Sequence, residues 1–380
     1  MLVFLTFVTF IFPILAIPIQ LFFLFKCEKN KKKYVLFLLS VSIGVIVFHL
    51  IPTKEMDLYR YYNLINLHRI YPVDIKKEIL NNSDPITYFL IFFISNLKSN
   101  GFLPFVAVIL YYNLFYISIE KILKNLNLNK TEYNKSLLYL LSISVIATIA
   151  SGIRFGLATA LFSCSLAFLT NKQRIKGYVF MVLSILSHST LIFPAIIYLI
   201  INLKKNKIGL KDYIFLIIVL IFPSFLTKII SYLSMISFLS SLSQKLGYYY
   251  TFYFPGGTWY IFRIIIFILN LILLFKTKKI KFDNPYINSI INLQTYLAII
   301  SIFTLPYYNI SIRFINLFNN FSIFIMIFNW YKDINKKYIN LIIFTVAVLY
   351  GTRNFEQMKS YNFGSYSISQ WFYNFFSLLK

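Results

Sequence analysis

Long apolar runs separated by short basic segments are the main pattern in this chain of 380 residues. Several runs are close to the about 20 residues that cross a bilayer core as a helix. They are 2–25, 101–119, 212–227 and 259–275. These runs lack the alternation of apolar and polar residues expected of a membrane β-strand. The pattern predicts an all-α polytopic membrane protein that forms one integral membrane domain over 1–380, with 2–25 retained as the first helix.

Short basic segments between the apolar runs hold most of the 37 lysine and arginine residues. They are 26–33, 121–135, 171–176, 203–211, 276–284 and 331–337. Because cytoplasmic loops are enriched in these residues, we expect every one of these segments on the cytoplasmic side. An even number of crossings must then separate neighbouring segments, which predicts turns near Gly152, His188 and Pro306. The result is about twelve transmembrane helices with both termini outside.

The first large outer segment, 51–100, contains an apolar stretch at 84–97 that is too short to cross a membrane. At about 1.5 Å per residue it would cover about 20 Å of a hydrocarbon core about 30 Å thick. We therefore predict an interfacial helix on the outer face, with Asp84 at its cap and Pro85 in its first turn. The other expected outer segments are 228–258 and 351–380.

Composition agrees with a membrane protein, because 59% of the residues are hydrophobic and 13% are charged, whereas soluble proteins carry about 25% charged residues. The net charge of +25 lies largely in short loops, so we expect a lipid bilayer and no nucleic acid as partner. The two cysteines, Cys27 and Cys164, are expected at different membrane levels and predict no disulfide. There is no Gly-rich phosphate loop, H-E-x-x-H or Asp-x-Asp pair, so we expect no metal and no cofactor.

Three ionisable residues, Arg154, His188 and Arg313, stand within apolar runs. An intramembrane cation costs about 2.5–3.5 kcal/mol on insertion scales, so such residues usually face a cavity and mark a functional site. The predicted topology gathers these and other charged residues at the outer side. The others are Asp57, Arg60, Asp84 and Arg263.

Arg154 and Arg313 are candidates for binding a pyrophosphate. A planar guanidinium grips phosphate oxygens through paired hydrogen bonds, and two guanidinium groups suit two phosphates. Small residues around Arg154 would let a ligand approach. The alternative for Arg154 is a side chain that extends from a helix end to the outer headgroups, and Arg263 could also be an interface anchor.

The remaining candidates have simple alternatives. His188 lies between two serines at an expected apex, which favours proton transfer or ligand contact over a buried neutral histidine. Asp57 and Arg60 are three residues apart, so they form either a solvated ion pair or, with Tyr61, a carbohydrate site in which an aromatic ring stacks on a sugar. Capping of a helix could by itself explain Asp84.

In order and placement these residues resemble the EpsG-like, Wzy-type polysaccharide polymerase family. The similar features are an early outer Asp with tyrosines (Asp57, Tyr61), an acidic-Pro-aromatic helix start (Asp84, Pro85, Tyr88), an Arg after a small-residue turn (Arg154), an apical His-Ser (His188, Ser189) and a late outer Arg (Arg313). The resemblance covers about residues 55–320, and the family often has Glu in place of Asp84.

The resemblance implies a GT-C-like fold and a metal-independent glycosyltransferase of the bacterial inner membrane. Such an O-antigen polymerase transfers a growing glycan from undecaprenyl pyrophosphate, or another polyprenyl pyrophosphate, onto a lipid-linked repeat unit. The reaction belongs to polysaccharide or lipopolysaccharide biosynthesis and takes place at the outer, periplasmic face. The implied partners are the lipid-linked donor and acceptor, a flippase and a chain-length regulator.

This transfer needs a base near the acceptor hydroxyl and cations near the departing pyrophosphate. We assign Arg154 and Arg313 to the pyrophosphate, and either His188 or Asp57 to the base. The expected substrate-binding residues are Arg60, Tyr61, Asp84 and Arg263. The alternatives are a lipid-linked oligosaccharide flippase or transporter, a ligase-type glycosyltransferase, and an acyltransferase that uses His188. A transporter would be expected to show internal repeats, and none is evident.

Overall fold

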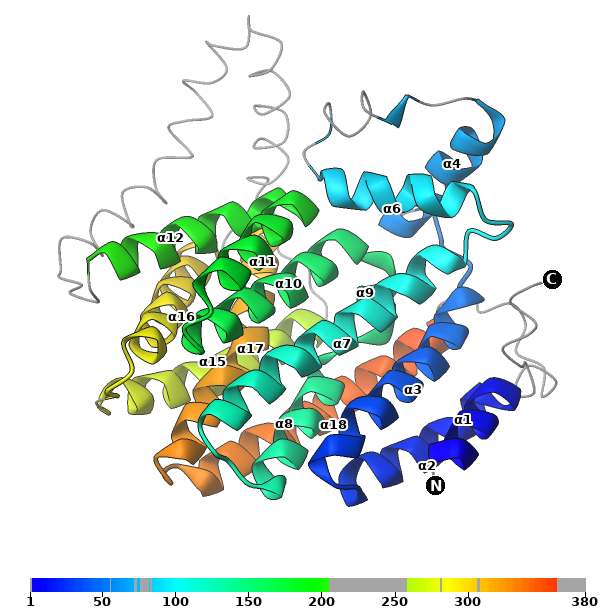
Figure 1. Cartoon of the computed structure of the whole chain (residues 1–380). Helices are drawn as coiled ribbons and strands as arrows, with labels where there is room; N and C mark the ends of the chain where they lie inside the picture. Colours follow the sequence, from blue (N-terminus) through cyan, green and yellow to red (C-terminus); the bar gives the residue numbers. More distant parts are fainter. Residues whose placement is uncertain are drawn as a thin grey trace, which may run out of the picture. The chain divides into compact units, whose positions relative to one another are not determined.

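The computed structural model, shown in Figure 1, describes residues 2–54, 56–71, 74–75, 82, 84–204, 258–280, 282–305 and 308–360. Every regular element in these ranges is helical, which confirms the all-α prediction. The chain divides into two compact units, one formed by 1–192 with 346–380 and the other by 193–345. Each unit is described by itself.

The first unit contains the helices that precede Phe193. They are α1 (Leu2–Ile11), α2 (Pro13–Lys26), α3 (Lys29–Phe48), α4 (Asp57–Ile70), α6 (Pro85–Ser95), α7 (Phe102–Asn125), α8 (Lys130–Ile143), α9 (Ile146–Ser151), α10 (Ile153–Thr170), α11 (Arg174–Ser187) and the 3-10 turn η1 (Ser189–Leu191). The second unit contains α12 (Ile192–Leu203), α15 (Thr258–Lys278), α16 (Pro285–Phe303) and α17 (Tyr308–Tyr331). Helix α18 (Lys336–Ser360) begins in the second unit and enters the first at Val346.

Helix α7 is the central helix of the first unit, and α3, α8 and α10 pack against it. The Asn113 side chain donates to Ser40 Oγ (3.1 Å) while the Phe48 ring meets Phe102 (5.0 Å), so α3 runs antiparallel to α7. Helix α10 runs parallel to α7, because Cys164 lies at Leu114 and Asn171 lies farther along, at Lys121. The chain must therefore return between α7 and α10.

The path of the chain between α7 and α10 confirms the predicted turn at Gly152. Helix α8 runs antiparallel to α7, since Tyr133 lies at Glu120 and Ser144 lies at Tyr111. The chain continues through α9, which ends at Ser151, and Gly152 separates α9 from α10. Helix α11 then packs on α10, where Gly177 permits close approach: a Cβ atom there would lie 2.5 Å from Leu169 Cγ.

Three of the basic segments meet at one end of the first unit. The Lys130 ammonium donates to Lys26 O (2.6 Å), which joins segment 121–135 to segment 26–33. The buried Lys32 ammonium donates to Leu24 O and to Asn134 Oδ1, both at 2.6 Å. Asn171, at the start of the third segment, donates to Lys121 O (3.3 Å). This arrangement agrees with the expectation that these segments share one side of a membrane.

The prediction of a single first helix over 2–25 is wrong. The chain breaks at Phe12 and Pro13, where proline supplies no backbone donor to continue the helix. Gln20 Nε2 donates to Thr9 Oγ1 at 2.7 Å, although a straight helix would hold these residues about 16 Å apart along its axis. Helix α1 therefore bends back on α2, and both pack against α3.

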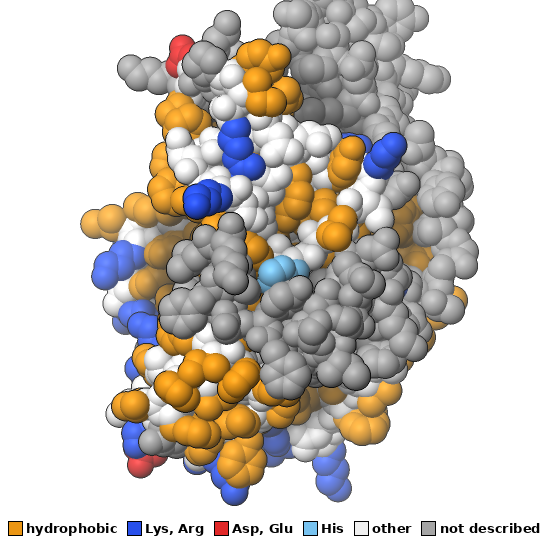
Figure 2. All heavy atoms as spheres, turned by 90° about the vertical axis from the view of Figure 1, so that its right-hand side faces the viewer, with side chains coloured by type: hydrophobic (Ala, Val, Ile, Leu, Met, Phe, Trp, Pro, Cys, Tyr) orange, Lys and Arg blue, Asp and Glu red, His pale blue; other side chains and the backbone are white. Residues whose placement is uncertain are grey.

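Five helices among the described residues are long and apolar enough to cross a membrane: α7, α10, α15 from Tyr260, α16 and α17. Large apolar side chains are widely exposed on the outside, including Ile175 and Phe344, and Figure 2 shows broad hydrophobic areas with scattered lysines and arginines. Such a surface is typical of a protein that faces lipid. The number of about twelve transmembrane helices stays a prediction.

The predicted breaks at the other two turns fall where elements end. Helix α11 ends at Ser187 and η1 follows His188, while α16 ends at Phe303 and α17 begins at Tyr308. The short helix predicted at 84–97 is α6, which packs on α4, α7 and α11; its place on the outer face stays a prediction. Segments 212–227 and 228–257, most of 203–211, Pro306 and the tail from 361 lie outside the described residues.

In the second unit, buried amides join the packed helices α15 and α17. Asn270 donates to Asn319 Oδ1 (3.1 Å) and Asn329 donates to Thr277 Oγ1 (2.6 Å). Inside a membrane such hydrogen bonds between helices add to close packing. The pairings run in the same order along both helices, so α15 and α17 are parallel.

Candidate functional site

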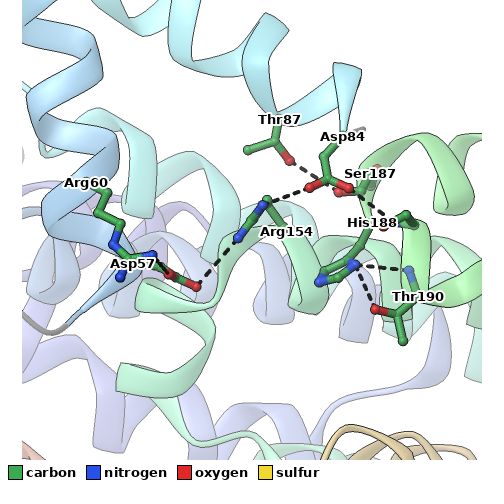
Figure 3. A network of polar contacts seen from close by, with 9 residues as sticks. Asp57, Arg60, Asp84, Thr87, Arg154, Ser187, His188 and Thr190 are labelled. Atoms are coloured by element: carbon green, nitrogen blue, oxygen red, sulfur yellow. Dashed lines mark hydrogen bonds and ion pairs between the residues drawn. The ribbon is translucent and has the colours of Figure 1, made fainter. Parts of the chain in front are cut away.

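Arg154 is the centre of a polar cluster in the first unit. It is the second residue of α10, and its two terminal nitrogens face two different carboxylates. Nη1 donates to Asp84 Oδ2 at 2.8 Å, and Nη2 lies 3.8 Å from Asp57 Oδ2. Figure 3 shows these residues brought together from α4, α10 and the residue before α6. The guanidinium is thus held by carboxylates and is not extended alone towards headgroups.

Asp84 joins Arg154 to the turn at His188. It occupies the cap position of α6 and Pro85 is the first helical residue, as predicted, but the Asp84 side chain makes no capping hydrogen bond. Its second oxygen, Oδ1, instead accepts from the backbone N–H of Ser189 (3.1 Å), and the residue is 2% exposed. Capping is therefore the wrong explanation for Asp84, since both carboxylate oxygens bind groups from distant helices.

His188 is buried at the turn between α11 and η1. Its Nδ1 accepts from the backbone N–H of Thr190 (3.1 Å), and Thr190 Oγ1 lies 3.0 Å from the same nitrogen. The Phe155 ring packs against the imidazole edge to face, with 5.8 Å between centroids. On the other side of the turn, Thr87 Oγ1 donates to Ser187 O (3.4 Å). Two helices, α6 and α10, thus fix the position of the imidazole.

Asp57 is the accessible carboxylate of the cluster. It is the first residue of α4, its side chain is 44% exposed, and it lies 3.7 Å from Arg60. Both of its ion pairs, to Arg60 and to Arg154, are longer than a hydrogen bond. The pair with Arg60 confirms the expected adjacency on one helix face. Exposed pairs of this kind contribute little to stability, so the Asp57 carboxylate is available to a ligand.

Three helices begin around Arg154. Asp57 opens α4, Asp84 precedes α6, and Arg154 is in the first turn of α10. The N-terminus of a helix carries a partial positive charge and unpaired backbone N–H groups, which favour anions. The two carboxylates and the two arginines of the cluster balance each other in formal charge, so the helix ends leave the cluster electropositive.

Tyr61 lies beneath Arg154, and its ring centroid is 5.7 Å from the guanidinium carbon. The residue is 5% exposed, and this burial raises the pKa of the Tyr61 hydroxyl against the opposing effect of Arg154. Its ring therefore contacts the arginine and presents no open face to a sugar.

Arg263 and Arg313 lie in the second unit, on the parallel helices α15 and α17. Each is in the second turn of its helix, and Tyr260 Oη lies 3.4 Å from Ser311 Oγ nearby, so the two arginines lie at the same level. Within the second unit, this agrees with the expectation that Arg263 and Arg313 lie at one level of the membrane. The proposed pairing of Arg313 with Arg154 stays a prediction.

Arg69 is a residue that the sequence analysis missed. Near the end of α4, its guanidinium donates to Ser95 O (3.2 Å) and Leu97 O (2.6 Å) at the end of α6, and to Asn100 Oδ1 (2.6 Å). The last carbonyls of a helix lack partners within the helix, and a cation there is favourable. Arg69 thus ties together the C-terminal ends of α4 and α6, the two helices whose N-terminal ends carry the carboxylates that face Arg154.

We expect Arg69→Met to lower the midpoint of thermal unfolding. Methionine keeps an apolar stem but loses every hydrogen bond to the end of α6, so α4 would no longer hold Asp57 firmly at Arg154. Thermal unfolding of the full-length protein in detergent measures the effect. Arg69→Lys should give an intermediate midpoint, because one ammonium cannot reach all of these carbonyls. An unchanged midpoint in Arg69→Met would show that apolar packing alone positions α4.

Within the described ranges no three His, Cys, Asp or Glu side chains are grouped as metal ligands. The positive charge of the cluster comes from guanidinium groups and helix ends.

Comparison with known proteins places the chain in a family. The sequence model of the EpsG family matches residues 37–368. The chain belongs to the EpsG family. The match runs from α3 to beyond α18 and includes every residue of the cluster around Arg154, so the resemblance seen in the sequence is confirmed. No curated protein and no solved structure matches this EpsG family member.

Proposed function

We propose that this EpsG family protein is a polysaccharide polymerase. It transfers a glycan from a polyprenyl pyrophosphate carrier, such as undecaprenyl pyrophosphate, onto the non-reducing sugar of a lipid-linked repeat unit. Membership in the EpsG family indicates a polymerase-like activity. The observation that carries the finer proposal is the cluster in which Arg154 joins Asp57, Asp84 and the His188 turn.

The position of the cluster supports a reaction on the outer face. Segments 26–33, 121–135 and 171–176 meet at one end of the first unit, and Arg154 and His188 lie at the opposite ends of the same helices. If the basic segments face the cytoplasm, the cluster faces the periplasm or the exterior. A bacterial inner membrane with lipid-linked glycans delivered to its outer leaflet fits this orientation.

The chemistry of the cluster suits transfer from a lipid pyrophosphate. The acceptor hydroxyl attacks the anomeric carbon, the bond to the phosphate oxygen breaks, and the pyrophosphate leaves with its bonding electrons. Arg154 and three helix N-termini favour that developing charge, and Arg313 is proposed to bind the second phosphate. In this proposal guanidinium groups take the place of a metal ion. The proposed fold is GT-C-like with about twelve transmembrane helices, and the proposed protein partners are a flippase and a chain-length regulator.

The lipid-linked glycans of a deletion strain test this function. A strain without the gene should accumulate single exported repeat units, and a plasmid copy should restore long chains. Absence of any exported repeat would instead identify a flippase, and long chains left unattached would identify a ligase. Either of these results would contradict the polymerase proposal.

A further inference from the structure

The hydrogen bonding of His188 determines which part of the imidazole can take part in chemistry. A backbone N–H can only donate, and the N–H of Thr190 points at Nδ1 (3.1 Å). Nδ1 must therefore present its lone pair, and the neutral ring carries its proton on Nε2. The opposite tautomer would set two donors against each other.

This tautomer gives His188 no lone pair with which to accept a proton from a substrate. In a neutral imidazole one nitrogen donates and the other accepts, and here the accepting nitrogen serves the cap of η1. Protonation at Nδ1 would break that cap. In Figure 3 the Nε2 edge is turned away from Thr190, on the side where Arg154 and Asp57 lie. His188 is thus arranged as a hydrogen-bond donor.

Of the two carboxylates beside Arg154, Asp57 has the geometry of a base. Both oxygens of Asp84 are occupied, by Arg154 at 2.8 Å and by Ser189 N at 3.1 Å, and its side chain is almost fully buried. The Asp57 carboxylate is half-exposed and has no partner within hydrogen-bond distance in its two ion pairs. A substrate hydroxyl can therefore reach Asp57 but not Asp84.

We propose that Asp57 is the catalytic base and that His188 is a catalytic hydrogen-bond donor acting through Nε2. This inference rests on the proposed polymerase function. The acceptor O–H proton moves to an Asp57 oxygen as the hydroxyl oxygen bonds to the anomeric carbon and the pyrophosphate leaves with the electron pair. The donor pyrophosphate takes the place of Asp57 at Arg154 Nη2, where the contact is loose, while Asp84 keeps Nη1. Binding of the donor thus releases the base.

Amide substitutions at the two residues separate these roles. In His188→Gln the amide N–H can occupy the position of Nε2–H, whereas in His188→Asn the shorter amide can replace only Nδ1 at the Thr190 cap. Asp57→Asn keeps the shape of the side chain and removes its basicity. Because Asp57 is exposed and loosely paired, this variant should fold normally.

The measurement is single-turnover elongation of a lipid-linked repeat unit by the full-length protein in bilayer nanodiscs. We expect His188→Gln to keep a rate within about tenfold of wild type, and Asp57→Asn to lose roughly 10²–10⁴-fold, the usual contribution of a general base. His188→Asn should fall well below His188→Gln. Asp333→Asn is the matched control, since Asp333 forms an exposed ion pair with Lys336 three residues along, as Asp57 does with Arg60.

Donor binding and thermal unfolding, measured on the same samples, show that each variant is folded. A folded His188→Gln as slow as Asp57→Asn would overturn the inference, and so would elongation that survives in Asp57→Asn. Both results leave the polymerase function intact, because wild-type elongation tests that function separately. Failure of the wild-type protein to elongate would overturn the polymerase function and the assignment of the base with it.

Discussion

Replacement of Arg154 by lysine is expected to remove most chain elongation while the protein remains inserted in the membrane. The guanidinium uses its two ends separately, Nη1 for Asp84 at 2.8 Å and Nη2 towards Asp57 at 3.8 Å. A lysine has one compact ammonium group, which cannot reproduce this fork or grip a phosphate through paired hydrogen bonds. Loss of one charge-stabilising donor typically costs about 10²–10³-fold in rate, so we expect about a 10²-fold slower transfer.

The measurement is the length distribution of lipid-linked glycan, normalised to the amount of inserted protein. Arg174→Lys is the matched control, because Arg174 is an exposed arginine at the start of α11, at the opposite end of this helix from His188. That variant should make normal chains. Normal chains from Arg154→Lys would instead mean that a positive charge alone suffices at this position, and would remove Arg154 from the proposed pyrophosphate site.

The position of the charged residues along the helices was largely predictable from the spacing of the lysine-rich segments. The requirement that basic segments share one side placed turns at Gly152 and His188, and helices end at both positions. The same requirement put Asp57, Asp84 and Arg154 at one level, and the structure brings them into contact. Positions along a helical hairpin follow from the sequence because each helix has a fixed rise per residue.

Partners across the fold were not predictable, because the sequence pattern carries no information about which side chains face each other. Asp84 has the residue type and position of a helix cap, yet its carboxylate binds Arg154 and Ser189. The tautomer of His188 depends on one backbone N–H, that of Thr190. Arg69 lies in a polar stretch that gives no sign of a special role. Only the tertiary packing of α4 on α6 brings its guanidinium to the carbonyls that it binds.

The sequence contained a signal for the break in the predicted first helix. The run at 2–25 is long enough to cross a membrane, and the lysines that follow it agree with a single helix. Pro13 and Pro18 both lie inside it, however, and proline in a helix interior removes a hydrogen bond and clashes with the preceding turn. Pro18 is accommodated within α2, whereas Pro13 marks the break. Length and apolarity alone did not distinguish a span from two short helices.

Asp84→Asn is expected to lower both stability and elongation, because Asp84 is buried and connects three segments. An asparagine has one acceptor oxygen and one amide donor, so it can serve either Arg154 or Ser189 N, and its N–H₂ then faces the other donor. Removing one partner of a buried ion pair costs roughly 3–5 kcal/mol. Because the Arg154 side chain is 30% exposed, we expect the lower end of that range, together with elongation reduced at least tenfold.

Asp84→Glu separates the need for charge from the need for shape. A glutamate keeps two acceptor oxygens and its charge, so it can still join Arg154 to the backbone of Ser189 after a small shift of α6. We therefore expect this variant to retain most elongation and most thermal stability in detergent, well above Asp84→Asn. Asp74→Asn, at an exposed aspartate of the same outer segment, should change neither property. Equal and severe loss in Asp84→Glu and Asp84→Asn would mean that the exact reach of the aspartate, and not its charge, holds the His188 turn against Arg154.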